Sequence, residues 1–182
     1  MIDDLRKYTE FLVGLGTKNI DHTEGSFLAH LIQVYRDLKR WGFDEAVCLA
    51  GLFHSIYGTD KFREFALPLE RRDEVRALIG ERAERLAFLY CAMDRKSFDC
   101  SLEKGVAPYQ MTDRFTSEQI EFSADDFEDI CGLQLVDWLE QVPRSKQWDY
   151  RRETHRRIAD RMGEFAQQEY KRVYALENQT ST

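Results

Sequence analysis

The chain has 182 residues, of which 43% are hydrophobic and 32% charged, with only three prolines. This composition is typical of a globular protein rather than a disordered segment. The length suits one domain, so we expect a single domain over residues 1–176 and a frayed tail over 177–182. The formal net charge of -7 excludes a generally basic surface, so we expect no nucleic acid and no acidic membrane among the partners.

Localisation and redox state follow from what the sequence lacks. No run approaches the roughly 18 apolar residues of a membrane span, and residues 1–4 have neither the basic nor the apolar part of a signal peptide. We therefore expect a cytoplasmic protein. The four cysteines are widely spaced without a CxxC motif, which favours free thiols over disulfides or thiolate-bound zinc. They are Cys48, Cys91, Cys100 and Cys131.

Apolar residues recur every three or four positions through most of the chain, and this spacing predicts an all-α fold. Between residues 95 and 122 the helical period disappears and Gly105 and Pro108 interrupt the chain. That segment is expected to form a short hairpin or ordered loop between the fifth and sixth helices. The expected helices cover residues 2–15, 26–41, 44–58, 67–79, 81–93, 123–143 and 148–176.

Three polar residues stand where these helices should be buried. His30 falls at the edge of the apolar stripe of its helix, and His54 follows a segment that is apolar on every side. Asp94 continues the apolar row of the preceding helix, and a buried acid needs a partner. Two inward histidines and an aspartate would make a metal site with imidazole and carboxylate ligands. Taken singly, a core histidine or a helix-end aspartate is more often a residue satisfied by hydrogen bonds than a metal ligand.

The segments AHLIQVYRDLKRWG, VCLAGLFHSIYGT and LAFLYCAMDR together resemble the HD-domain superfamily. The resemblance covers about residues 22–95 and rests on a histidine, a His-Asp pair after a helix of small apolar residues, and a distal aspartate. In this chain the pair reads His54-Ser55, and HSIYGT is similar to a branch of uncharacterised bacterial HD-like proteins that carry the same serine.

This resemblance implies a helical bundle that binds one or two divalent metals. HD proteins hydrolyse phosphate esters of nucleotides in many cases, and a smaller branch uses two irons for oxygenation. Carried over by position, His30 is the first ligand, His54 the second and Asp94 the last. Because Ser55 replaces a carboxylate, a dinuclear site is disfavoured, and a mononuclear site for Fe, Mn or Zn, or a site without metal, remains.

Other residues are candidates for the surroundings of this site. His22 could act as a fourth ligand or general base, or cap the following helix. Tyr57 could act in catalysis or simply pack, and the segment from Arg95 to Phe122 is expected to border the cavity. His155 is expected to serve packing or an interface. The residues expected to contact an anionic substrate are Ser55, Thr59, Arg95, Lys96 and Arg114, although charged runs are usually solvated surface.

Two hypotheses follow from the sequence. The first is a metal-dependent hydrolase or oxygenase that acts on a small, anionic molecule. The second is a degenerate HD domain without metal that binds a small ligand or a partner protein, and Ser55 is its physical basis. Either protein could form a homodimer.

Overall fold

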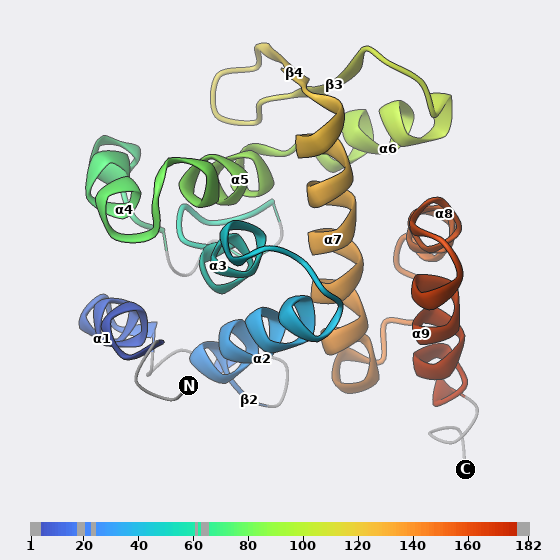
Figure 1. The fold of residues 1–182 in the computed structure, drawn as a ribbon, viewed down its shortest axis with the longest axis horizontal. Helices are drawn as coiled ribbons and strands as arrows, with labels where there is room; N and C mark the ends of the chain where they lie inside the picture. Colours follow the sequence, from blue (N-terminus) through green and yellow to red (C-terminus); the bar gives the residue numbers. More distant parts are fainter. Residues whose placement is uncertain (1–4, 18–20, 23–24, 61, 63–65, 178–182) are drawn as a thin grey trace. The chain divides into compact units, whose positions relative to one another are not determined.

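We analysed a computed structural model that describes residues 5–17, 21–22, 25–60, 62 and 66–177. These residues are mostly helical, as the sequence predicts, with a small antiparallel hairpin between α6 and α7 (Figure 1). Contacts divide the chain into two compact units, Met1–Cys91 and Ala92–Thr182. The prediction of a single domain stays a prediction.

The first unit is built from helices around an apolar centre. Its α2 and α3 lie side by side (Figure 1). The amphipathic pattern of α2 buries one face, which includes Phe27, Leu31 and Leu38, as its apolar spacing predicts. The elements are α1 (Arg6–Gly14), β1 (Asp21–His22), β2 (Gly25–Ser26), α2 (Phe27–Arg40), α3 (Glu45–Phe53), the 3-10 helix η3 (Leu69–Arg71), α4 (Arg72–Ile79) and α5 (Glu81–Ala92).

Helix α3 forms the buried centre of this unit. The side chain of Asp44 caps it by accepting a hydrogen bond from the Val47 amide at 2.9 Å. The helix ends at Phe53, five residues before the predicted end near residue 58, because tight turns follow, with Gly58 at a φ of 71°. The Leu67 amide then donates a hydrogen bond to the Ile56 carbonyl at 2.8 Å, and this bond joins the two ends of the loop between them.

A buried carboxylate joins the end of this loop region to α4 and α5. Glu84, whose side chain is 1% exposed, accepts hydrogen bonds from Tyr57 Oη at 2.9 Å and from Arg72 Nε and Nη2 at 2.7 and 3.0 Å. Arg76 contributes a longer contact of 3.5 Å. Such a carboxylate is tolerated in the interior only because its oxygens have these donors.

The second unit combines a long helix with a hairpin and three shorter helices. Its strands β3 and β4 pair with Tyr109 opposite Phe122 and Thr112 opposite Gln119. Its elements are α6 (Arg95–Lys104), β3 (Tyr109–Thr112), β4 (Gln119–Phe122), α7 (Ala124–Ser145), α8 (Arg152–Met162) and α9 (Glu164–Tyr174).

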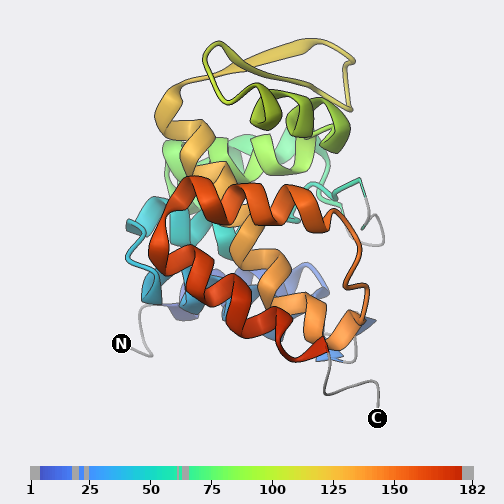
Figure 2. The ribbon, with the colours of Figure 1, turned by 90° about the vertical axis from the view of Figure 1, so that its right-hand side faces the viewer.

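Two predicted boundaries in this unit are wrong. Residues 95–104 were expected to be non-helical, but Asp94 caps them and Phe98, Ser101 and Leu102 are buried on one face, so they form α6. The single helix predicted over residues 148–176 is divided at Gly163, whose φ of 95° is incompatible with a continuous helix. The two pieces, α8 and α9, lie side by side (Figure 2).

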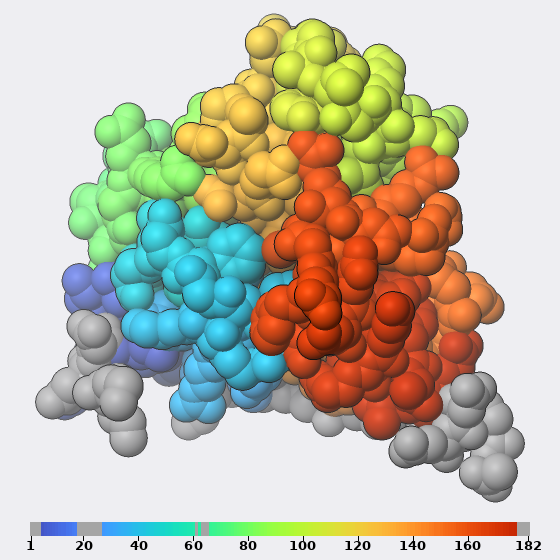
Figure 3. Space-filling model, turned by 45° about the vertical axis from the view of Figure 1, so that its right-hand side comes forward, coloured from blue at the N-terminus to red at the C-terminus, as the bar shows by residue number. Residues whose placement is uncertain are grey.

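Helices α8 and α9 form part of the surface of the second unit (Figure 3), and their sequence is rich in arginine. These arginines are neutralised locally: Arg156 pairs with Glu153 and Asp160, and Arg157 pairs with Glu153 and Glu103. This face therefore presents paired charges rather than a basic patch for a polyanion.

Two expectations from composition can be compared with the structure. All four cysteines are free thiols, and three of them are buried. Within the described part of the chain, no helix has both the length and the apolar character that crossing a membrane requires.

The buried Glu84 generates a stability prediction. Arg72→Met should lower the free energy of unfolding by about 3 kcal/mol, because it leaves a buried carboxylate without its main cation. The matched control is Arg71→Met, whose partner Glu74 is 46% exposed, so its loss should change stability by less than about 1 kcal/mol. Urea unfolding of both variants measures the difference. Equal losses of stability in the two variants would show that the Arg72–Glu84 pair contributes no more to stability than a surface ion pair does.

His155 generates a prediction of pH dependence. Burial, aided by Arg151 and Arg95, holds the pKa of His155 well below its usual 6.5. The unfolded chain therefore binds a proton near pH 6.5 that the folded chain does not bind, so stability falls as the pH drops below that value. The expected slope is up to about 1.4 kcal/mol per pH unit. In His155→Phe, which keeps a ring to stack on Trp138, this part of the slope should vanish from urea unfolding at pH 7, 6 and 5. An unchanged slope would contradict the assignment.

Candidate metal centre

Two helices of the first unit bring a pair of histidines together. His30 lies on the buried face of α2, and His54 is the residue that terminates α3. Both are almost fully buried, as the sequence indicated, at 3% and 2% exposure. Their Nε2 atoms lie 3.4 Å apart, and the rings meet nearly at right angles.

The protonation of His54 follows from its neighbours. Its Nδ1 lies 2.7 Å from the Gly51 carbonyl oxygen. Because a carbonyl can only accept, Nδ1 carries the proton and donates it there, which leaves the lone pair on Nε2. This arrangement is the one that metal-binding histidines show, with the second ring nitrogen fixed by a carbonyl or carboxylate.

Two further contacts fix the position of His54. The Cys91 thiol donates to the His54 carbonyl oxygen at 3.1 Å. The ring of Tyr90 meets the imidazole edge-on, with the ring centroids 5.2 Å apart. Helix α5 therefore holds both the backbone and the ring of His54, so little reorganisation is needed for Nε2 to act as a ligand.

The separation of the two Nε2 atoms, which allows a long hydrogen bond, is also compatible with a shared metal ion. At 3.4 Å it exceeds the range of about 2.7–3.2 Å typical of hydrogen bonds from nitrogen donors. Two imidazole nitrogens, each about 2.0–2.1 Å from one tetrahedral ion, would lie about 3.3–3.4 Å apart. The pair therefore passes a simple geometric test for metal coordination.

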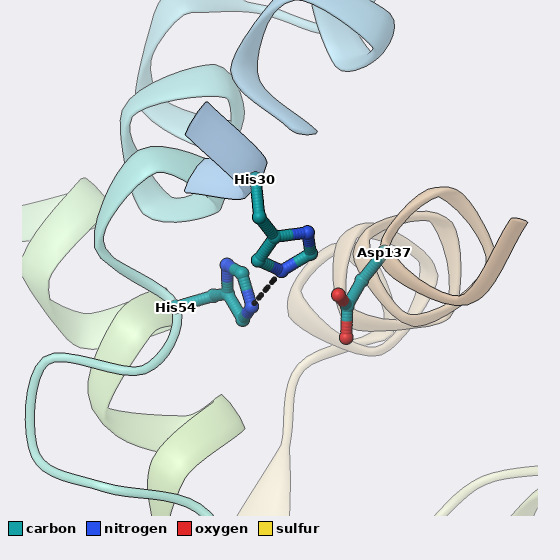
Figure 4. A group of neighbouring side chains, drawn as sticks. All are labelled: His30, His54 and Asp137. Carbon is teal, nitrogen blue, oxygen red and sulfur yellow. Dashed lines mark hydrogen bonds between the residues drawn. The ribbon is translucent and has the colours of Figure 1, made fainter. Parts of the chain in front are cut away.

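An aspartate completes the group. His30, His54 and Asp137, all buried, each offer one ligand atom, and these atoms lie within 4.8 Å of one another (Figure 4). Asp137 comes from α7, and its Oδ1 accepts a short hydrogen bond from Gln141 Nε2 one turn further along that helix. Among the described residues, this group could hold a metal ion.

Asp137 was not among the residues selected from the sequence, although a signal existed. It interrupts the run from Leu133 to Leu139, in which apolar residues surround it on both sides. The reasoning that singled out Asp94, an acid where an apolar residue is due, applies equally to Asp137. Choosing between the two acids required knowing which of them stands near the histidines.

Asp94 makes a capping contact in the structure. It is the N-cap of α6, and its Oδ1 accepts a hydrogen bond from the Ser97 amide at 2.8 Å. It is half-buried rather than buried, and the group of candidate ligands contains Asp137 in its stead. The helix-end alternative considered for Asp94 thus describes its observed contact.

The predicted residues that follow His54 in sequence are all buried. Ser55, Tyr57 and Thr59 are each less than 5% exposed. Burial, together with the Glu84 carboxylate, raises the pKa of Tyr57, so its hydroxyl stays protonated and donates to Glu84. The Thr59 hydroxyl accepts from the Phe62 amide at 3.0 Å. Tyr57 and Thr59 therefore have structural contacts within the first unit.

The predicted basic contacts differ in exposure. Lys96 is exposed, whereas Arg95 and Arg114 are half-buried, and the Arg114 guanidinium lies 4.0 Å from the centre of the Phe115 ring. Their role in anion binding stays a prediction, as does the bordering role of residues 95–122. His22 lies in β1, and its side chain is outside the described part of the structure.

Comparison with known proteins gives one match. Residues 11–95 match a family described as "Domain of unknown function (DUF6817)". The match covers both histidines of the pair but not Asp137. No curated protein and no solved structure matches the chain. Since the matched family states no activity, the resemblance to HD domains stays a prediction.

Two substitutions of Asp94 separate its contribution as a helix cap from the contribution of its negative charge. Asp94→Ala should lower the free energy of unfolding by about 1 kcal/mol through loss of the α6 cap. Asp94→Asn, which retains an oxygen that accepts from the Ser97 amide, should lower it by only a few tenths of a kcal/mol. Urea unfolding without added metal measures both. If Asp94→Asn lowers the free energy of unfolding as much as Asp94→Ala does, the negative charge rather than the capping hydrogen bond contributes the stability.

Proposed function

We propose that His30, His54 and Asp137 bind one divalent metal ion and that the protein is an HD-like metal-dependent enzyme acting on a small, anionic molecule. The observation that carries this proposal is the convergence of two buried Nε2 atoms at 3.4 Å, with the His54 proton fixed on the opposite nitrogen. Asp137 takes the place that the resemblance gave to Asp94.

The donor set indicates which metals to test. Two imidazoles and one carboxylate suit iron, manganese or zinc, and the same set with open positions is typical of mononuclear Fe(II) enzymes. Three protein ligands leave at least one coordination position for water or substrate. When bound, such an ion supplies Lewis-acid activation for hydrolysis or, as iron, a redox centre for oxygenation.

One metal is favoured over two because of Ser55. In the HD pattern the residue after the second histidine is a carboxylate that holds or bridges metal, and here it is a neutral, buried hydroxyl. A hydroxyl is a poor substitute for a carboxylate in binding a divalent cation.

The chain's own residues prepare the site. The Gly51 carbonyl holds the proton of His54 on Nδ1, and Gln141 donates a hydrogen bond to Asp137 Oδ1, so both side chains are oriented by a second contact. Burial of all three ligands excludes bulk water and strengthens the electrostatic interactions of an ion with its ligands.

The second candidate function is a metal-free HD-like module that binds a small ligand or a partner protein. Ser55 favours it, because loss of the paired carboxylate weakens any metal site of this type. The two functions differ in whether the isolated protein binds metal.

The metal proposal predicts metal-dependent stability. Wild-type protein should hold about one equivalent of iron, manganese or zinc by elemental analysis after purification without chelator. At a free metal concentration 100 times the Kd, the apo protein should gain about 2.7 kcal/mol of stability, a rise in Tm of roughly 5–10 °C. In His54→Ala and Asp137→Ala, the rise should vanish.

Asp94→Ala is the matched control, because it removes an acid that lies outside the group and should keep the metal-dependent rise in Tm. Loss of the rise in Asp94→Ala together with its retention in Asp137→Ala would restore Asp94 as the ligand. A wild-type protein that gains no stability from Fe(II), Mn(II) or Zn(II) would overturn the metal proposal in favour of the binding module.

A further inference from the structure

Two buried side-chain atoms of the second unit have no hydrogen-bond partner among the described residues, Gln134 Nε2 and His155 Nδ1. A buried donor left unsatisfied costs about 1–3 kcal/mol. Such atoms are rare in native proteins, and a bound water, ion or ligand is a common reason for them. The amide of Gln134 is the more informative of the two because its orientation is fixed.

Arg151 determines which atom of the Gln134 amide is free. Its Nη1 donates to Gln134 Oε1 at 2.9 Å. A guanidinium has only donors, so the amide atom that faces it must be the oxygen. The nitrogen, with two hydrogens to donate, therefore points elsewhere, and Gln134 is only 2% exposed.

Arg151 is itself held firmly. Its Nε and Nη2 donate to the two carboxylate oxygens of Asp99 on α6, the Nε contact at 3.0 Å. Its backbone adopts the left-handed conformation at the start of α8, with a φ of 45°, which costs a non-glycine residue about 1–2 kcal/mol. The side chains of Asp99, Arg151 and Gln134 thus form a rigid series whose last member presents an amide nitrogen.

Gln134 lies on α7, the helix that also carries Asp137. Residues three and four apart lie on the same side of a helix, so Gln134 and Gln141 flank Asp137 by one turn in each direction. Gln141 donates to the Asp137 carboxylate, whereas Gln134 has the donor that no described residue accepts.

We propose that Gln134 is a substrate-positioning residue whose Nε2 donates a hydrogen bond to an oxygen of the molecule bound at the metal's open position. The inference rests on the proposed function. Since Nε2 can only donate, the group it meets must be an acceptor. A divalent cation favours a negatively charged acceptor, so the ligand class is a carboxylate or a phosphate.

The test uses the full chain loaded with Co(II), whose visible absorption reports changes in coordination. Titration with acetate and with inorganic phosphate gives the Kd of each anion. In Gln134→Met, which keeps the side-chain length but removes the amide, the Kd of the better-bound anion should rise about 10- to 100-fold, the effect of losing one hydrogen bond to a charged group. The Kd of Co(II) itself should change less than about threefold.

Gln168→Met is the matched control, because the Gln168 amide nitrogen donates to the exposed Glu164 at the surface. This variant should bind both anions as wild type does. If Gln134→Met fails to fold, Gln134→Glu serves instead, since it keeps an oxygen for Arg151 and replaces the donor by an acceptor. An anion affinity within twofold of wild type in the folded variant would overturn the inference and assign Nε2 to a buried water. A Co(II)-loaded wild type that responds to neither anion would also overturn it, whereas failure to bind Co(II) at all would refute the proposed function itself.

Discussion

The hydrogen bond from His54 Nδ1 to the Gly51 carbonyl is the constraint on which the candidate site depends. It joins a side chain to the last turn of the helix that carries it, so the direction of Nε2 is set by the backbone of α3 rather than by a flexible rotamer. Because α3 is buried almost all round, it cannot shift without disturbing the core. The imidazole is therefore a fixed feature of the candidate site.

The sequence predicted most of the helices but did not single out Asp137, and the physical reasons differ. The periods of α2 and α7 reflect a buried face and are visible in the chain itself. Helix α6 was missed because its buried apolar residues, Phe98 and Leu102, are outnumbered by polar ones. The break at Gly163 was missed because the segments on both sides of this glycine are strongly charged, so their apolar period is weak. His30 and His54 were found because both interrupt apolar faces. Asp94 and Asp137 satisfy the same criterion, and only the tertiary structure separates a helix cap from a group near the histidines.

Each unit contains an ion pair that contacts a buried third polar residue: the pair of the first unit includes the buried Glu84, whereas Arg151 and Asp99 of the second are half-buried. In the first unit Arg72, Glu84 and Tyr57 satisfy one another, as buried polar groups usually do. In the second, Asp99 and Arg151 are paired, but Gln134 at the end of the series keeps a donor without a partner among the described residues. Networks whose polar groups are all satisfied favour rigidity, and the second unit differs in that Gln134 Nε2 and His155 Nδ1 have no such partner among the described residues.

The hydrogen bond from the Leu67 amide to the Ile56 carbonyl closes a loop that begins two residues after His54. A loop whose two ends are joined by a hydrogen bond can change length with only a small change in closure entropy. The position of the imidazole therefore depends on the helix that precedes it and on this hydrogen bond rather than on the number of residues that the loop contains.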